Sequence, residues 1–305
     1  MTKIKALATT FTITVAAIAA SVGPAAAADA QTLTVPDGIS AGIMVYDRHT
    51  HSAELQYNAH QQFRSASVVK LMIALDYLET NGTDVPPVDL AQLQPMLRSS
   101  DDDAASYLWV KDGWETIVQR VVAKVGLTDS APPVNRGMWG YTAISAADVV
   151  KLYDYILTQA APAVRDFIIG NLRQSTKCGN DGFDQSFGIP SAVSRPWAVK
   201  QGWSGFGDTP DPVCSPANPV PPPPGQAARG FNSAEVGSGE HSLTTTTGGD
   251  LDLTRRAMHT TGVIGPQDDK IMVVLTLEPV GTSWQDSATR ITALTSVVYQ
   301  LSKWL

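Results

Sequence analysis

A serine and a lysine stand three residues apart in Ser67-Val68-Val69-Lys70, the only Ser-x-x-Lys of the 305-residue chain. The helical spacing of the apolar residues that follow predicts that both lie on one face of the first turn of a helix. A serine hydroxyl becomes a nucleophile when a neighbouring group takes its proton, and a lysine kept neutral by burial can do this. Backbone N–H groups at a helix start also stabilise a developing oxyanion. The pair indicates acyl transfer through Ser67, although a capping serine followed by a lysine also arises by chance.

Two further segments carry suitable side chains. Ser100-Asp101-Asp102 opens a predicted helix, and Lys200-Gln201-Gly202 follows a short apolar strand over 197–199. If the fold brings both lysines near one serine, each disfavours protonation of the other, which lets a lysine act as a base near neutral pH. The three segments together therefore favour a serine hydrolase.

In order and spacing, these segments resemble the S-x-x-K, S-D-N and K-[TS]-G motifs of the penicillin-recognising serine hydrolases, nearest the class A β-lactamases. The resemblance covers the chain after its first 28 residues, apart from a proline-rich insertion. It implies an α/β (α+β) fold of the β-lactamase/transpeptidase type. In that fold an antiparallel sheet is built from both chain ends, and the site lies in the cleft beside an inserted helical domain.

The resemblance also implies a role for each residue. Ser67 is the nucleophile that is acylated, Lys70 accepts its proton, and Ser100 passes a proton to the leaving group. Lys200 holds Ser100 and a substrate carboxylate by charge, and the backbone N–H groups of Ser67 and Trp203 form the oxyanion hole. The other residues expected to bind substrate are Asp102, Gln201 and Gly202.

The chain departs from the family motifs at three places. Asp102 stands where the family has Asn, which replaces an amide by an acceptor-only carboxylate when it is ionised. Gln201 replaces a small hydroxyl residue, and the segment 126–145 lacks the glutamate that drives deacylation in the family. We therefore expect an acyl-enzyme that turns over slowly.

Three hypotheses remain open at this point. The first is a hydrolase acting on a β-lactam or a D-amino-acid peptide of the peptidoglycan type. The second is a binding or sensor protein that is acylated slowly or not at all. The third is a β-lactamase whose base is another carboxylate, such as Asp129.

Other chemistry finds little support. No G-x-S-x-G elbow occurs, and His49-Thr50-His51 lacks the acidic partner of a metallo-hydrolase, so we expect neither a metal nor another cofactor. The formal net charge of −7 argues against nucleic acid as a partner. Trp139 and Trp203 flank the inferred site and are expected either to line the cleft or to pack in the core.

The elements that must position these residues are readable from periodicity. Strands are expected over 42–47, 53–58, 257–264 and 271–277, and amphipathic helices over 67–81, 90–109, 114–125, 146–156, 163–172 and 286–305. Ser145 is expected to cap the helix that follows it. An α/β domain is predicted over 29–66 together with 191–305, and a helical domain over 67–190. The proline-rich insertion, over 204–254, belongs to the α/β domain.

The first 28 residues have the features of a signal peptide. Lys3 and Lys5 precede a mostly apolar run, and Ala26-Ala27-Ala28 offers a cleavage site. We therefore expect a secreted, extracellular protein, and we expect it to be a monomer. Since no cysteine lies near the cleavage site, no membrane anchor is expected after cleavage.

The chain has two cysteines, Cys178 and Cys214, and in an exported protein such a pair usually forms a disulfide. Two unpaired buried thiols are the alternative. Residues 210–224 hold eight of the twenty prolines and favour an extended arm next to the Lys200 strand. This arm is either a stiff flap over the site or a surface loop without a role.

Overall fold

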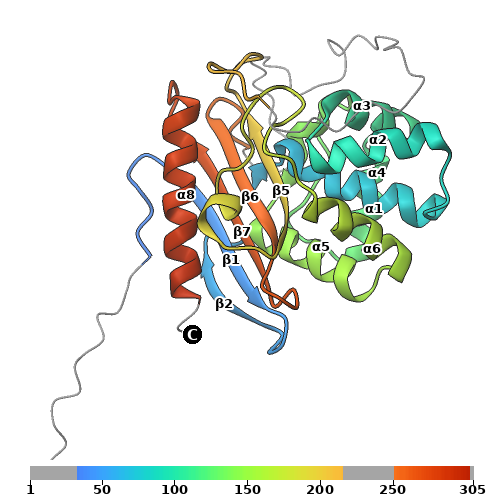
Figure 1. Cartoon of the computed structure of the whole chain (residues 1–305), viewed down its shortest axis with the longest axis horizontal. Coiled ribbons are helices and arrows are strands. Elements are labelled where there is room, and N and C mark those ends of the chain that lie inside the picture. Colours follow the sequence, from blue (N-terminus) through green and yellow to red (C-terminus); the bar gives the residue numbers. More distant parts are fainter. Residues whose placement is uncertain (1–32, 216–250, 303–305) are drawn as a thin grey trace, which may run out of the picture. The chain divides into compact units, whose positions relative to one another are not determined.

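The computed structural model describes residues 33–215 and 251–302, which form an antiparallel sheet between helices (Figure 1). The strand order is β2-β1-β7-β6-β5, so the two chain ends meet where β1 pairs with β7. The strands of this sheet are β1 (Ser40–Asp47), β2 (Ser52–Tyr57), β5 (Trp197–Ser204), β6 (Arg256–Ile264) and β7 (Lys270–Glu278). The sheet expected from both chain ends is therefore confirmed.

The central strand β7 is buried on both faces, which explains its nearly continuous apolar sequence. Successive side chains of a strand point to opposite faces. Val273 accordingly joins the hydrophobic cluster on the side of the main helical layer, which the helices between residues 70 and 173 form. Met272 and Val274 join the cluster beneath the C-terminal helix α8 (Trp284–Leu301). Helices must therefore cover both faces of the sheet.

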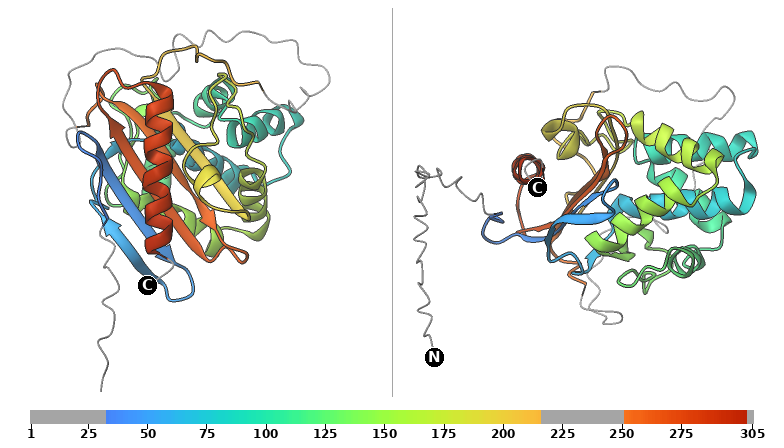
Figure 2. Two further views of the ribbon diagram at one scale, coloured as in Figure 1. Left: turned by 60° about the vertical axis from the view of Figure 1, so that its left-hand side comes forward. Right: turned by 90° about the horizontal axis from the view of Figure 1, so that it is seen from below.

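Figure 2 shows this arrangement, with α8 on one face and α5 (Ala146–Thr158) and α6 (Pro162–Arg173) on the other. Ser145 caps α5 as expected, because its Oγ accepts a hydrogen bond from the backbone N–H of Asp148 at 3.1 Å. The remaining helices of the described part are α1 (Lys70–Asn81), α2 (Pro87–Arg98), α3 (Asp102–Lys111), α4 (Thr116–Val125) and α7 (Ile189–Ala192). Two short 3-10 turns, η1 (Ala66–Val69) and η2 (Trp139–Tyr141), and a two-stranded ladder, β3 (Phe63–Arg64) with β4 (Ala143–Ile144), complete it.

The helix expected from residue 67 is divided at its start. Ser67 lies in the turn η1, and α1 begins at Lys70. Every residue of α1 from Lys70 to Leu78 is buried, so the helix passes through the middle of the main helical layer. The Ser67–Lys70 motif therefore ends at the first residue of a largely buried helix.

The bounds of two further elements, one helix and one strand, differ clearly from those expected from the sequence. The helix expected over 90–109 is two helices, α2 and α3, because Ser100 adopts a left-handed backbone conformation with φ of 55° between them. The strand expected to end at Val199 continues to Ser204, so Lys200, Gln201 and Gly202 lie within β5 rather than after it. Pairing with β6 continues through this stretch, and tertiary pairing overrides the turn tendency of a glycine.

The predicted signal peptide over 1–28 lies outside the described residues, and so does the portion of the proline-rich insertion over 216–250. Within the described ranges, no helix has the length and apolar character that crossing a membrane requires.

Candidate active site

Ser67 and Lys70 are in direct contact, as their spacing predicts. Lys70 Nζ donates a hydrogen bond to Ser67 Oγ at 2.7 Å. The turn that carries Ser67 is held in place because the Ser65 N–H donates to the carbonyl of Thr142 at 2.8 Å. Ala66, directly before the serine, has a φ of 44°, a left-handed conformation that costs energy for a non-glycine residue. Such local strain is typical of functional sites in which the surrounding structure fixes the backbone.

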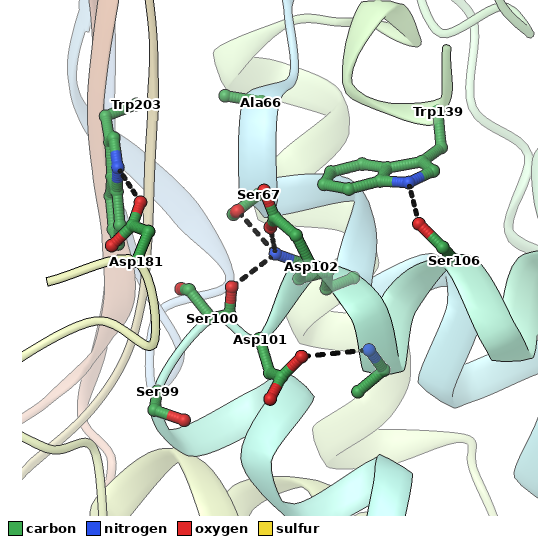
Figure 3. A network of polar contacts seen from close by, with 12 residues as sticks. Ala66, Ser67, Ser99, Ser100, Asp101, Asp102, Ser106, Trp139, Asp181 and Trp203 are labelled. Carbon is green, nitrogen blue, oxygen red and sulfur yellow. Dashed lines mark hydrogen bonds and ion pairs between the residues drawn. The ribbon is translucent and has the colours of Figure 1, made fainter. Parts of the chain in front are cut away.

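Lys70 has two further oxygen partners (Figure 3). Its Nζ donates to the Ser100 carbonyl at 2.7 Å and forms an ion pair with Asp102. The ring of Trp139 lies on another side, with its centroid 4.7 Å from Nζ. Because an ammonium group has three hydrogens, these three oxygens match the donors of a protonated lysine. Lys70 must therefore release a proton before it can accept the one on Ser67.

Ser100 links the two lysines. Its carbonyl accepts from Lys70, and its hydroxyl accepts a hydrogen bond from Lys200 Nζ. The same hydroxyl donates to Gln185 Oε1 at 3.2 Å, and Gln185 Nε2 is in turn anchored on the Arg98 carbonyl at 2.7 Å. The structure thus brings together the serines and lysines that the spacing singled out.

Lys200 is fully enclosed, with 1% of its surface exposed. Burial holds the pKa of Lys200 well below its ordinary value, and the charge of Lys70 lowers it further. Lys200 is therefore disposed to be a neutral amine, which is suited to exchanging a proton with the Ser100 hydroxyl and poorly suited to holding an anion by charge.

Gly202 allows β5 to approach the turn that carries the nucleophile. A Cβ at this position would lie 3.0 Å from the Ser65 carbonyl oxygen and 3.3 Å from the Ser67 nitrogen. Because β5 is the edge strand of the sheet, some of its backbone groups face η1 rather than another strand. Gly202 therefore brings β5 against the turn that carries Ser67, and Ser67 and Trp203 line the same cavity. An oxyanion hole formed by their two N–H groups stays a prediction.

An open cavity reaches Ser67; with the solvent at its mouth included, its space is about 420 Å³. Its wall includes Asp102, Asp181, Trp203 and Ser204 at the end of β5, and the segment 205–208 that follows. Asp181 comes from the loop before β5, and its Oδ2 accepts a hydrogen bond from Trp203 Nε1 at 2.8 Å (Figure 3). Desolvation raises the pKa of Asp181, although its side chain is reached by solvent at the cavity mouth. A substrate bound at Ser67 would therefore meet the Asp181 carboxylate.

Three predicted residues are placed differently from the others. The Gln201 side chain is buried, and its Nε2 donates to the Phe187 carbonyl rather than lining the cavity. Trp139 is fully buried in the core beside Lys70. Asp129 accepts hydrogen bonds at its Oδ2 from His60 and Ser145, both at 2.8 Å, and does not line the cavity.

Sequence reasoning did not single out Asp181 or Gln185. Both lie between α6 and β5, in a stretch that carries no recognisable motif. The one available signal was the predicted disulfide, since Asp181 follows Cys178 by three residues.

That disulfide is formed, which confirms the expected pairing of Cys178 with Cys214 across 36 residues. The Cys214 N–H donates to the Gly182 carbonyl at 2.7 Å, so the bond and this contact tie the Asp181 loop to the chain that follows β5. Among the residues that the structure describes, no group of three or more His, Cys, Asp or Glu side chains is placed to hold a metal ion.

No protein-family model matches the chain. Among curated proteins, it is 41% identical over 174 residues to the "Putative lipoprotein LppW" of Mycobacterium tuberculosis and of Mycobacterium bovis. The match covers 54% of this chain and 54% of each relative, so the chain spans about half the length of the curated relatives it matches.

Solved structures are similar over most of the chain. PBP-A has a TM-score of 0.59 at 12% identity, covering 90% of this chain and 93% of that one, and one variant of PBP-A is an acyl-enzyme complex with penicillin G. A class A β-lactamase from Bacteroides cellulosilyticus has a TM-score of 0.58 at 14% identity, covering 86% and 91%. The chain therefore has the penicillin-recognising serine hydrolase-like fold, a mixed α+β architecture with an antiparallel sheet.

Proposed function

We propose that the chain is a serine hydrolase that forms an acyl-enzyme at Ser67 with an amide or ester substrate. The observation that carries the proposal is the hydrogen bond of 2.7 Å between Lys70 Nζ and Ser67 Oγ, at a cavity that reaches the serine. The substrate classes that fit the fold are β-lactams and D-amino-acid peptides of the peptidoglycan type.

The acylation step follows from the contacts around Ser67. Lys70, once it has released a proton, takes the hydroxyl proton while Oγ attacks the substrate carbonyl carbon. The backbone N–H groups of Ser67 and Trp203 stabilise the negative oxygen of the tetrahedral intermediate. Ser100 gives its hydroxyl proton to the leaving atom as the bond between that atom and the carbonyl carbon breaks, and the proton that Lys70 took from Ser67 replaces it. Lys200 holds the Ser100 hydroxyl in position.

A binding or sensor protein is the second candidate, and one observation favours it. The ion pair with Asp102 stabilises a positive charge on Lys70. In addition, none of the described residues that line the cavity is a glutamate that could activate a water for deacylation. A protein with these features would capture a substrate or react with it once, rather than turn it over rapidly.

The experiment that separates the two candidates is covalent labelling. The chain is treated with a fluorescent penicillin, with the methyl ester of that penicillin and with an alkyl fluorophosphonate, and the labelled peptide is identified by mass spectrometry. We expect label on Ser67, a burst followed by slow turnover, and no label on a folded Ser67→Ala variant. Absence of label from all three probes would favour the binding protein, and burst-free turnover at ordinary enzyme rates would contradict the slow deacylation.

We also infer that the protein is exported. The start of the chain has the pattern of a signal peptide, and the curated relatives carry the name of a lipoprotein. That name indicates attachment to a membrane, whereas we expect release, because both cysteines of the chain are joined to each other in the disulfide. Fractionating cells that produce the full chain into culture medium and membranes decides between these outcomes.

A further inference from the structure

We propose that Asp181 sets the charge preference of the cavity, so that the substrate presents a positively charged amine beside Trp203 rather than a carboxylate. The inference rests on the proposed function, because it concerns the substrate of the Ser67 site. It departs from the expectation that Lys200 holds a substrate carboxylate.

The Asp181 carboxylate is held rigidly at the cavity wall. Its Oδ2 accepts from the indole N–H of Trp203 at 2.8 Å, and its Oδ1 accepts from the backbone N–H of Phe183 at 3.1 Å. Trp203 follows Gly202, the β5 residue that lies against the Ser67 turn, and lines the cavity together with Ser67. The negative charge therefore lies beside the strand along which the substrate would bind.

Among the described residues that line this cavity there is no lysine or arginine. The ammonium group of Lys70 is already paired with Asp102, and Lys200 lies behind Ser100 with a pKa held low by burial. Gln201, which stands where the family has a hydroxyl residue, uses its amide N–H on the Phe187 carbonyl. The described residues thus offer a substrate carboxylate no positively charged partner at the wall of the cavity.

Asp208, on the segment that follows β5, is exposed and lines the same cavity. A substrate carboxylate entering here would lose part of its hydration and meet two carboxylates without a neutralising charge, which is unfavourable at the low effective dielectric of a protein surface. A positively charged amine would instead be attracted by the same two carboxylates. Asp181 is the better placed of the two, because two hydrogen bonds from protein N–H groups fix its position.

The test uses three fluorescent penicillins that differ only at the carboxyl position: the free acid, its methyl ester and its amide with ethylenediamine, which ends in an amine. The second-order rate of labelling of Ser67 is measured at about pH 8, which lies about four units above the ordinary pKa of an aspartate and so allows for the raised pKa of Asp181. We expect the amine to react fastest and the free acid slowest, with at least about a tenfold span. In Asp181→Asn this span should fall to about threefold or less.

Asp184→Asn is the matched control, because Asp184 lies in the same loop and pairs with Lys177 outside the cavity. This variant should keep the order of the three rates. The inference is overturned if the free acid reacts with the wild-type protein as fast as the amine, or if Asp181→Asn leaves the span unchanged. If the alkyl fluorophosphonate also fails to label Ser67, the hydrolase proposal itself falls, and with it this inference.

Discussion

Asp102 forms an ion pair with Lys70, the same lysine that donates to the Ser67 hydroxyl at 2.7 Å. The family motif has a neutral asparagine at this position, so the aspartate adds a negative charge next to the group that must act as the base. A nearby carboxylate stabilises the ammonium form of a lysine, and that form has no lone pair with which to accept a proton. In the proposed mechanism, the charge of Asp102 therefore opposes acylation of Ser67.

Replacing Asp102 by asparagine should increase the rate of acylation. The Asp102→Asn change keeps the size of the side chain and an acceptor oxygen for Lys70 while removing the charge. We expect the labelling rate of Ser67 at neutral pH to rise about tenfold, which corresponds to about 1.4 kcal/mol in the barrier. Slower labelling of a folded variant would instead mean that Asp102 accepts the proton that Lys70 releases.

Substituting Gly202 by alanine should impair the site by separating β5 from the nucleophile turn. The added Cβ would lie 3.0 Å from the Ser65 carbonyl oxygen, a backbone atom that cannot move aside easily. Because small misplacements of reacting groups are costly, we expect labelling of Ser67 to fall about 100-fold.

Gly170→Ala is the control for that substitution. Gly170 lies inside α6, and among the described residues no atom other than those of its chain neighbours and of the helix's own backbone lies within 4 Å of its added Cβ. The change should stabilise the protein by about 0.5–1 kcal/mol and leave labelling unchanged. Equal labelling by Gly202→Ala and Gly170→Ala would show that the close approach of β5 does not matter.

His259 should make the protein less stable in mild acid. The residue is fully buried, its Nε2 contacts the Arg64 carbonyl at 2.8 Å, and its Nδ1 accepts from the Thr276 N–H. Burial lowers the pKa of His259 from 6.5 to about 4. The unfolded chain therefore binds a proton first, so stability is lost as the pH falls from about 6.5 towards 4, by about 3 kcal/mol for this group.

Chemical denaturation at a series of pH values measures this loss. His259→Gln should show a flatter dependence between those two pH values than the wild-type protein, even though it is less stable at neutral pH. His60→Gln is the control, because the His60 side chain is 68% exposed, and it should keep the wild-type slope. Identical slopes for all three proteins would contradict the assignment.

Removing the disulfide should affect the site more than the fold. The pair Cys178→Ser and Cys214→Ser frees the loop that carries Asp181 from the chain after β5, whereas the sheet and its helices form the core. Chain entropy sets an upper limit of about 3–4 kcal/mol on the stability lost. Relative to the wild-type protein, we expect the rates of labelling by the three penicillins to change by a larger fraction than the free energy of unfolding does. A lower melting temperature with unchanged labelling rates would show that the bond is structural only.

Much of the fold was accessible from local patterns. Two β-rich runs separated by a turn over 265–269 predicted the strands over 257–264 and 271–277, and the apolar spacing after Ser67 predicted α1. These elements follow from side-chain periodicity, which is a property of neighbouring residues. The pairing of Cys178 with Cys214 was predicted for a related reason, since the chain has no other cysteine.

The same holds for the Ser67–Lys70 contact, because a separation of three residues on a helical turn determines it. The approach of Ser100 and Lys200 to that pair is a matter of tertiary structure, and here the resemblance to family motifs substituted for geometry. The resemblance did not predict that the pKa of Lys200 is lowered, because this shift depends on burial by residues distant in sequence.

Asp181 and Gln201 show what only the tertiary structure decided. Nothing in the residues next to Asp181 distinguishes it from other aspartates in turns, and its place at the cavity depends on Trp203 in β5. The Gln201 side chain was predicted to bind substrate and instead contacts Phe187, because strand β5 runs on past Lys200 and buries it. The direction of a side chain and the charge it meets result from packing between distant segments, which periodicity along the chain does not encode.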